Sequence, residues 1–247
     1  MVPEAIHRDD AATLAALGVA AYVCCDLLHE LAGHGGVCLA TGGRAGSFSA
    51  FHFQCLGGWQ PLVCAAGILV NLAAGTLAWM ALRWARISSP HARFFLWMFV
   101  AYNWFTGFGN LLTSSLANAG DAANAFHRTG WHWRPWMAGL GAVGYVLAVW
   151  ALRRERPARS WRSVLIPYFA AAIVACAGAA LNSILSPLSA LTSAVSTTLG
   201  AWGFLLVAST PSLTDEPLPR SRGWMAVAAA LTLVFVLYFG PGRLLRR

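Results

Sequence analysis

The sequence predicts an all-α polytopic membrane protein, with six to eight transmembrane helices and a short β-hairpin or strand between the first two. The 247 residues are 58% hydrophobic and only 11% charged, whereas soluble proteins carry roughly 25% charged residues. The chain contains repeated apolar runs whose lengths are near the roughly 20 residues that a helix needs to cross a bilayer. The connections between them are short, so we expect a single membrane-embedded domain over residues 1–247.

Seven apolar runs are candidates for transmembrane helices, and those at 136 and 223 are short enough to need interfacial aromatic residues to complete a crossing. The first run follows acidic residues, so we expect it to stay in the mature protein. The runs are Ala11–Leu28, Pro61–Leu82, Phe94–Leu116, Trp136–Leu152, Val164–Leu185, Leu188–Ser209 and Gly223–Phe239. Between the first two, the alternating segment Ser47–Phe53 predicts a short strand flanked by glycine pairs.

The charge of the chain is +8, and all 17 basic residues are Arg. They lie between apolar runs rather than along one amphipathic face, which favours contact with anionic lipid headgroups and argues against a nucleic-acid partner. Arg-rich loops around 83–93 and 153–162 indicate a cytoplasmic N-terminus in a bacterial-type inner membrane. With seven crossings, however, Arg243, Arg246 and Arg247 would lie on the opposite side, which conflicts with this rule.

Three of the nine acidic residues do not lie in polar ends or loops. Asp26 and Glu30 end the first apolar run, and Asp121 follows the third. Ionisable groups at membrane depth cost about 2.5 to 3.5 kcal/mol on insertion scales, so they are functional candidates by default. Asp121 is the only acid between Glu30 and Glu155.

The stretch from Asp26 to Gly36 contains His29-Glu30 and, five residues after His29, His34. In the His-Glu-x-x-His motif, the two imidazoles bind a divalent metal and the Glu between them activates a water molecule. Here the spacing is one residue longer, and residues five apart are about 140° apart around an ideal α-helix. A π-bulge near Gly33, or an end of the helix there that lets His34 turn back, would bring the ring nitrogens within about 4 Å of each other.

Two alternatives remain open for this stretch. Glu30 and His34 could form an i,i+4 ligand pair with His29 turned away, or the cluster could be an interfacial polar group without metal. Asp26, one turn before Glu30, could accept a hydrogen bond from a ligand His or act only as a cap. His52 is a weaker ligand candidate.

The His-Glu motif ending in Gly-His, followed by Gly42-Gly43 and the predicted strand, resembles the first metal-binding helix of the site-2 protease family of intramembrane zinc metalloproteases. The segment from Gly67 to Asn71 is similar to the Gly-x-x-x-Asn element on that family's next helix. The resemblance covers roughly residues 20–125. This chain departs from the family pattern in two ways: the His-Glu motif has one extra residue, and Asp121 does not lie in a Leu-Asp-Gly sequence.

The resemblance implies intramembrane, zinc-dependent hydrolysis of a peptide bond in a membrane-tethered substrate. It implies one Zn²⁺ per chain in a metal-site half at about 11–125, with accessory helices at about 134–240; His₂Asp would also accept Fe²⁺, Co²⁺ or Mn²⁺. We expect His29, His34 and Asp121 to be the metal ligands and Glu30 to be the general base. Asp26, Asn71 and Asn110 are expected to orient the ligands. Phe48, Phe51 and Phe53 are expected to contact the substrate strand.

Two other classes of function remain as alternatives. The chain could keep the metal but transport or sense it, or it could be a metal-free scaffold. The six cysteines contain no Cys-x-x-Cys pair, so a zinc ribbon or a thioredoxin-type dithiol is unsupported. We expect Cys38 and Cys55 to be small buried side chains. The alternative is a bridge between Cys38 and Cys55 if their loop faces an oxidising compartment.

Overall fold

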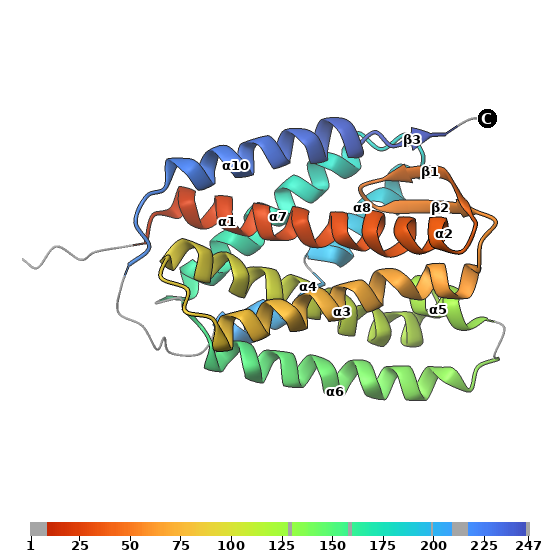
Figure 1. Ribbon diagram of the computed structural model, residues 1–247, viewed down its shortest axis with the longest axis horizontal. Helices are drawn as coiled ribbons and strands as arrows, with labels where there is room; N and C mark the ends of the chain where they lie inside the picture. Colours follow the sequence, from red (N-terminus) through yellow and green to blue (C-terminus); the bar gives the residue numbers. More distant parts are fainter. Residues whose placement is uncertain (1–8, 128–129, 158–159, 199, 209–216, 246–247) are drawn as a thin grey trace, which may run out of the picture.

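The chain forms a bundle of helices with a small sheet at one end (Figure 1). The computed structural model describes residues 9–127, 130–157, 160–198, 200–208 and 217–245. Within these residues, six helices are long and apolar enough to cross a membrane, and three strands form one antiparallel sheet. The chain is therefore a multi-pass membrane protein, and the predicted fold class is confirmed.

The helical segments follow one another through short connections. In chain order they are α1 (Ala11–Leu27), the π-helical segment η1 (Leu28–Gly35), α2 (Gly36–Ala40), α3 (Gln60–Trp84), α4 (Pro90–Ala117), α5 (Asp121–Phe126), α6 (Trp133–Arg154), α7 (Trp161–Ala180), α8 (Pro187–Thr198), α9 (Gly203–Ala208), α10 (Arg222–Leu233) and a second π-helical segment, η3 (Val234–Phe239).

Helix α1 lies at the centre of the bundle and continues through η1 and α2 as one 30-residue crossing. It packs against α4, α7 and α10, and its first turn is capped by the Asp10 side chain, which accepts from the Thr13 N–H at 2.9 Å. A Cβ at Gly18 would lie 2.2 Å from Pro167 Cβ of α7. Such close approach through small residues is a common packing device in membranes. This contact holds α1 in the core, and α1 continues into η1, the segment that carries His29 and His34.

The sheet covers the end of the bundle where α1 finishes (Figure 1). Strands β1 (Arg44–Ser49) and β2 (His52–Leu56) form a hairpin, and β3 (Arg243–Leu244) pairs with the other edge of β1. The predicted single strand is thus two strands with a turn between them, and the third strand, from the end of the described chain, was not predicted. Within the described residues, β2 has a partner on one side only, because the strand order is β2-β1-β3.

Three of the predicted runs differ from the observed helices. The run at 94–116 forms α4, which packs between α3 and α6 but is not one of the six helices apolar enough to cross the membrane. The run at 188–209 is one candidate crossing built from α8 and α9, with residues 199 and 209 outside the described part. Helix α7 ends at Ala180 rather than 185, because Asn182 Oδ1 accepts from the N–H groups of Ile184 and Leu185 in a turn before α8.

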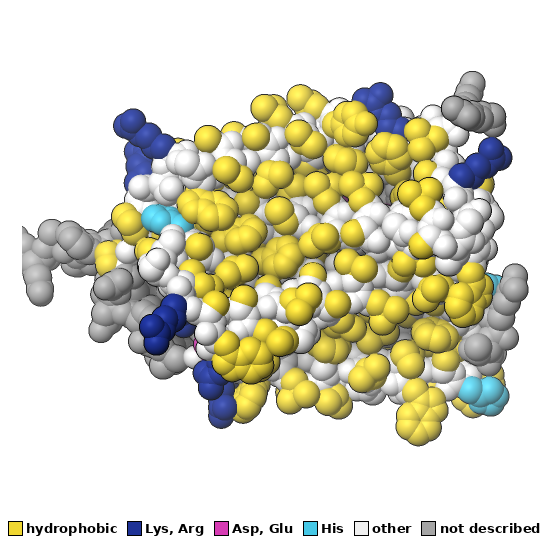
Figure 2. Space-filling view, in the orientation of Figure 1, with side chains coloured by type: hydrophobic (Ala, Val, Ile, Leu, Met, Phe, Trp, Pro, Cys, Tyr) yellow, Lys and Arg dark blue, Asp and Glu magenta, His cyan; other side chains and the backbone are white. Residues whose placement is uncertain are grey.

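The surface is apolar between two polar ends. Figure 2 shows hydrophobic side chains over the length of the helices and Arg side chains near both ends. Large apolar side chains such as Leu77, Val146 and Ile173 are about two-thirds exposed, which a water-soluble protein rarely allows over a contiguous area. This surface fits the hydrocarbon core of a bilayer.

Candidate metal centre

The π-helical segment η1 brings His29 and His34 together. An α-helix would turn residues five apart onto different faces, whereas the i→i+5 repeat of a π-helix returns them to one face. The two Nε2 atoms lie 3.2 Å apart, within the predicted 4 Å. The alternative in which His29 turns away from His34 is therefore wrong, and the departure from α-geometry near Gly33 is confirmed.

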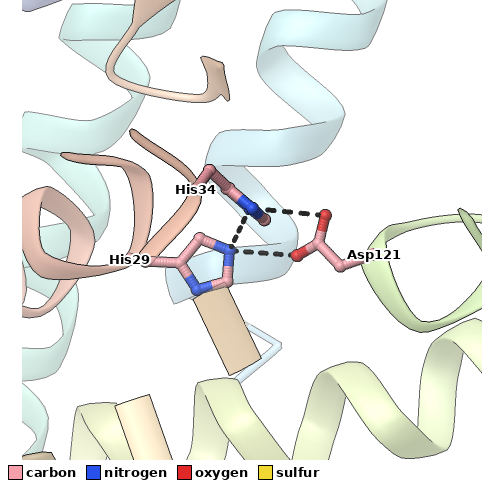
Figure 3. Close-up of side chains that lie close together, drawn as sticks. All are labelled: His29, His34 and Asp121. Atoms are coloured by element: carbon pink, nitrogen blue, oxygen red, sulfur yellow. Dashed lines mark hydrogen bonds and ion pairs between the residues drawn. The ribbon is translucent and has the colours of Figure 1, made fainter. Parts of the chain in front are cut away.

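Asp121 faces both histidines from α5, as Figure 3 shows. Its Oδ2 lies 3.0 Å from His29 Nε2, and its Oδ1 lies 3.6 Å from His34 Nε2. The chain reverses between α4 and α5 through Asn118 and Gly120, both with positive φ, and this turn carries Asp121 back over the end of α4. His29, His34 and Asp121 thus each offer one ligand atom, and these atoms lie within 4.8 Å of one another.

The spacing of these atoms suits a tetrahedral metal ion. Two ligand atoms that each lie about 2.0 to 2.1 Å from zinc in tetrahedral geometry are about 3.3 Å apart. The separations are 3.0 Å from His29 Nε2 to Asp121 Oδ2, 3.2 Å between the two Nε2 atoms, and 3.6 Å from His34 Nε2 to the other carboxylate oxygen, Oδ1. With one atom taken from each residue, the ligand atoms lie within 4.8 Å of one another, so small side-chain movements would let one ion contact all three.

Neighbouring groups orient each ligand through its remaining polar atoms. His34 Nδ1 donates to the carbonyl oxygen of Val63 at 2.7 Å, which leaves its Nε2 with a lone pair for a metal. Asn110 Nδ2 donates to Asp121 Oδ2 at 3.0 Å. Asn71 lies against His29, with its Nδ2 3.2 Å from His29 Nδ1.

The Asn71 amide supports the same assignment. Its Oδ1 is buried without a partner, although buried polar atoms are nearly always hydrogen-bonded. The amide oxygen and nitrogen are interchangeable by a 180° rotation. That rotation lets Oδ1 accept from His29 Nδ1–H, so the orphaned oxygen gains a partner and His29 Nε2 is free to bind a metal.

Gly67 of α3 lets this helix approach the two imidazole rings. A Cβ at Gly67 would lie 2.6 Å from His29 Nε2 and 2.8 Å from His34 Nε2, closer than real Cβ contacts. In the same region, a Cβ at Gly33 would lie 2.7 Å from Gly67 Cα. Glycine is thus required on both helices at this point for the histidines to be packed as they are.

Burial and hydrogen bonding act on Asp121 in opposite directions. Burial raises the pKa of the Asp121 carboxyl, but the neighbouring His29 and His34 imidazoles outweigh this effect and hold the pKa well below its usual range. The carboxyl is therefore ionised at neutral pH, as a metal ligand must be.

Glu30 and Asp26 line a polar cavity beside the ligands. The cavity has a volume of about 180 Å³, room for about six water molecules, and His29 and Asp121 also line it. Within the described part of the chain, Glu30 Oε2 and Asp26 Oδ2 are buried without hydrogen-bond partners. Asp26 accepts from the Tyr22 hydroxyl at 3.5 Å, and no hydrogen bond joins it to either histidine among the described residues.

The predicted substrate-strand residues lie around this region in three different settings. Phe48, in β1, packs on Phe239 at 5.9 Å between ring centroids. Phe51, in the hairpin turn, lines the polar cavity. Phe53, in β2, lies beside η1, where a Cβ at Gly35 would be 3.1 Å from its ring. His52 is not among the three residues whose ligand atoms meet.

One feature of the site was expected only as an alternative, and another was not predicted. Cys38 and Cys55 form a disulfide, so the expectation of small unpaired side chains is wrong for this pair; the bond ties the end of α2 to β2. The polar cavity is also lined by Ser193, Ser196 and Thr197 of α8. Hydroxyl residues in an apolar helix give little sequence signal, and these three lie about 160 positions after the histidines.

No protein-family model matches the chain, and neither does any curated protein or solved structure.

Proposed function

We propose that this protein is an intramembrane metalloprotease of the site-2 protease type, with one zinc ion held by His29, His34 and Asp121. The observation that carries the proposal is the convergence of one ligand atom from each of these three residues, all within 4.8 Å of one another, beside the carboxylate of Glu30. Three protein ligands leave a fourth position open, as catalytic zinc sites require. The resemblance of the His-Glu motif to that family supports the same reaction.

Each residue then has a distinct role in hydrolysis. Zinc, when bound, supplies Lewis-acid polarisation of the peptide carbonyl and activates water as a nucleophile. Glu30, with a free Oε2 in the polar cavity, takes a proton from the attacking water and returns it to the departing amine. Asn71 and Asn110 hold His29 and Asp121 in place.

The sheet supplies a place for the substrate backbone. The outer edge of β2 is unpaired within the described residues, and an extended peptide can add to such an edge through main-chain hydrogen bonds. Strand β2 packs against η1, and Phe51, in the turn just before β2, lines the cavity with Glu30. A peptide on β2 would therefore run past the metal centre.

The orientation in the membrane follows from two independent features. Most described Arg residues lie at the end where α1 begins, and few lie at the sheet end: Arg83, Arg86, Arg93, Arg153, Arg154, Arg156, Arg162, Arg220 and Arg222 against Arg44, Arg134 and Arg243. The positive-inside rule makes the first end cytoplasmic. The Cys38–Cys55 disulfide lies at the other end, and disulfides persist in oxidising compartments.

We therefore infer that the N-terminus is cytoplasmic and that the sheet faces the oxidising side, the periplasm in a bacterial inner membrane. Thiol alkylation of protein taken directly from membranes tests this orientation. We expect Cys38 and Cys55 to resist alkylation until a reductant is added. Free alkylation without reductant would overturn it.

Asp26 favours a second candidate function. Asp26 lines the cavity, and its Oδ2 is buried with no hydrogen-bond partner among the described residues. Hydrolysis gives this carboxylate no role. A protein that passes a metal ion through the cavity, or senses it there, would use such a carboxylate as a transient ligand.

Glu30→Gln separates the two functions. We expect this variant to bind zinc as the wild type does but to cleave membrane-tethered reporter peptides at least about 100-fold more slowly, the usual scale for loss of a general base. Glu155→Gln makes the same chemical change in a carboxylate paired with Arg83, 2.9 Å away, and should keep both properties. A wild type that binds zinc but cleaves no reporter, while moving zinc into proteoliposomes, would favour transport.

A further inference from the structure

A second, larger cavity lies next to the polar cavity of the metal centre. Its volume is about 460 Å³, within the range of pockets that bind small molecules, and it is formed by α4, α6 and the α8–α9 region. Four residues line both cavities, so the two share a wall: Thr106, Asn110, Ser196 and Thr197. Asn110 also holds the ligand Asp121.

The two sides of this cavity differ in chemistry. The shared wall carries three hydroxyl groups and an amide, whereas the remainder is mostly apolar, with Phe105, Leu112 and Tyr145 among its residues. Leu116, Trp202 and Leu206 on its rim are between half and two-thirds exposed on the apolar outer surface. The cavity therefore opens toward the bilayer on one side and adjoins the metal centre on the other.

We propose that this cavity is a specificity pocket that takes a large apolar side chain of the substrate, next to the bond that is cut; this inference rests on the proposed function. A peptide has a polar backbone and can carry an apolar side chain, which matches the polar shared wall and the apolar remainder. A lipid acyl chain has no group that would use the polar wall. The enzyme would thus prefer membrane-tethered peptides with an aromatic or long aliphatic residue at that position.

Gly109 offers a way to fill the cavity without touching a ligand. It lines the cavity, and a Cβ there would meet only Tyr145, at an ordinary 3.7 Å. Gly109→Leu therefore occupies the pocket. Gly139→Leu is the matched control, because a Cβ at Gly139 meets nothing within 4 Å and both changes replace a helical glycine by leucine. Leu112→Trp fills the same cavity if Gly109→Leu does not fold.

The probes are acetohydroxamic acid, which reaches only the metal, and ω-phenylalkyl hydroxamic acids, which add an apolar tail. Binding to the Co²⁺-loaded protein is followed by the visible spectrum of the metal. Each buried methylene is expected to tighten binding about fourfold. We expect the longer probes to bind wild type and Gly139→Leu at least about 50-fold more tightly than acetohydroxamic acid, and Gly109→Leu to lose most of this gain while keeping its affinity for acetohydroxamic acid.

The outcomes distinguish this inference from the proposed function. If acetohydroxamic acid changes the spectrum but the tail adds no affinity, or Gly109→Leu keeps the gain, the pocket is wrong and the metal centre stands. A gain that appears only after phospholipid is extracted would assign the cavity to a bilayer lipid and overturn the inference. If wild type binds no Co²⁺, or the bound Co²⁺ does not respond to acetohydroxamic acid, the proposed function fails and the pocket falls with it.

Discussion

Replacing Gly67 by alanine places a methyl group against the two histidine rings. The new Cβ would lie 2.6 Å from His29 Nε2 and 2.8 Å from His34 Nε2. Ordinary contacts of a Cβ begin at 3.4 Å, so the rings or helix α3 must move by about 0.8 Å. Metal sites keep their ligand distances within about 0.2 Å, so the variant cannot accommodate the methyl group and preserve the site.

The expected loss is large for one methyl group. Changes to groups that only orient a ligand cost about 10- to 100-fold in metal affinity, and Gly67→Ala displaces the ligands themselves. We therefore expect zinc affinity to fall by about 100-fold or more, equivalent to about 2.7 kcal/mol. Overpacking should also lower the free energy of unfolding of the metal-free protein by about 1 to 3 kcal/mol.

Gly75→Ala is the matched control on the same helix. A Cβ at Gly75 would lie 2.6 Å from Trp104 Cδ1, an equally close contact two turns from the histidines. Zinc affinity is measured by competition with a chelator in detergent, and stability by thermal unfolding without metal. We expect both variants to lose stability and only Gly67→Ala to lose zinc affinity. Wild-type zinc affinity in Gly67→Ala, or an equal loss in Gly75→Ala, would refute the reasoning.

Two further changes test how the site is supported. Asn71→Leu removes the partner of His29 Nδ1 and should weaken zinc binding about 10- to 100-fold, measured by chelator competition. The control is Asn103→Leu, because the Asn103 amide donates to Phe99 O of its own helix, and this variant should keep the wild-type zinc affinity. Equal zinc affinities in the two variants would contradict the role of Asn71. Cys38→Ser removes a disulfide between cysteines 17 positions apart and should lower the free energy of unfolding by about 3 kcal/mol on the chain-entropy model. The loss is measured as a lower melting temperature. An unchanged melting temperature when the wild-type disulfide is reduced would contradict this prediction.

The ligands could be predicted because charge at membrane depth is rare. His29, Glu30 and His34 stand out in an apolar run, and Asp121 was singled out because it is the only acid between Glu30 and Glu155. Their five-residue spacing also predicted a local departure from α-helical geometry, since an α-helix could not bring both rings to one ion. Long runs predicted the helices for the same reason, because a bilayer sets a minimum length.

Other parts of the site depend on contacts that leave little trace in the sequence. The His34 partner is a backbone carbonyl, at Val63, which any residue provides. Strand β3 is two residues long, too short for a periodic pattern. The disulfide depends on which side of the membrane Cys38 faces, and the α8 hydroxyl residues reach the cavity only through packing of helices distant in the chain.

The metal content of the purified protein tests the central claim most directly. Wild type, His29→Ala, His34→Ala and Asp121→Ala are loaded with zinc, freed of excess ion and analysed for metal per chain, with His52→Ala as the control histidine outside the ligand set. We expect one zinc per chain in wild type and in His52→Ala, and a large loss in each of the other three. A wild type that retains no zinc, or a His29→Ala and His34→Ala pair that each retain a full equivalent, would contradict the metal centre.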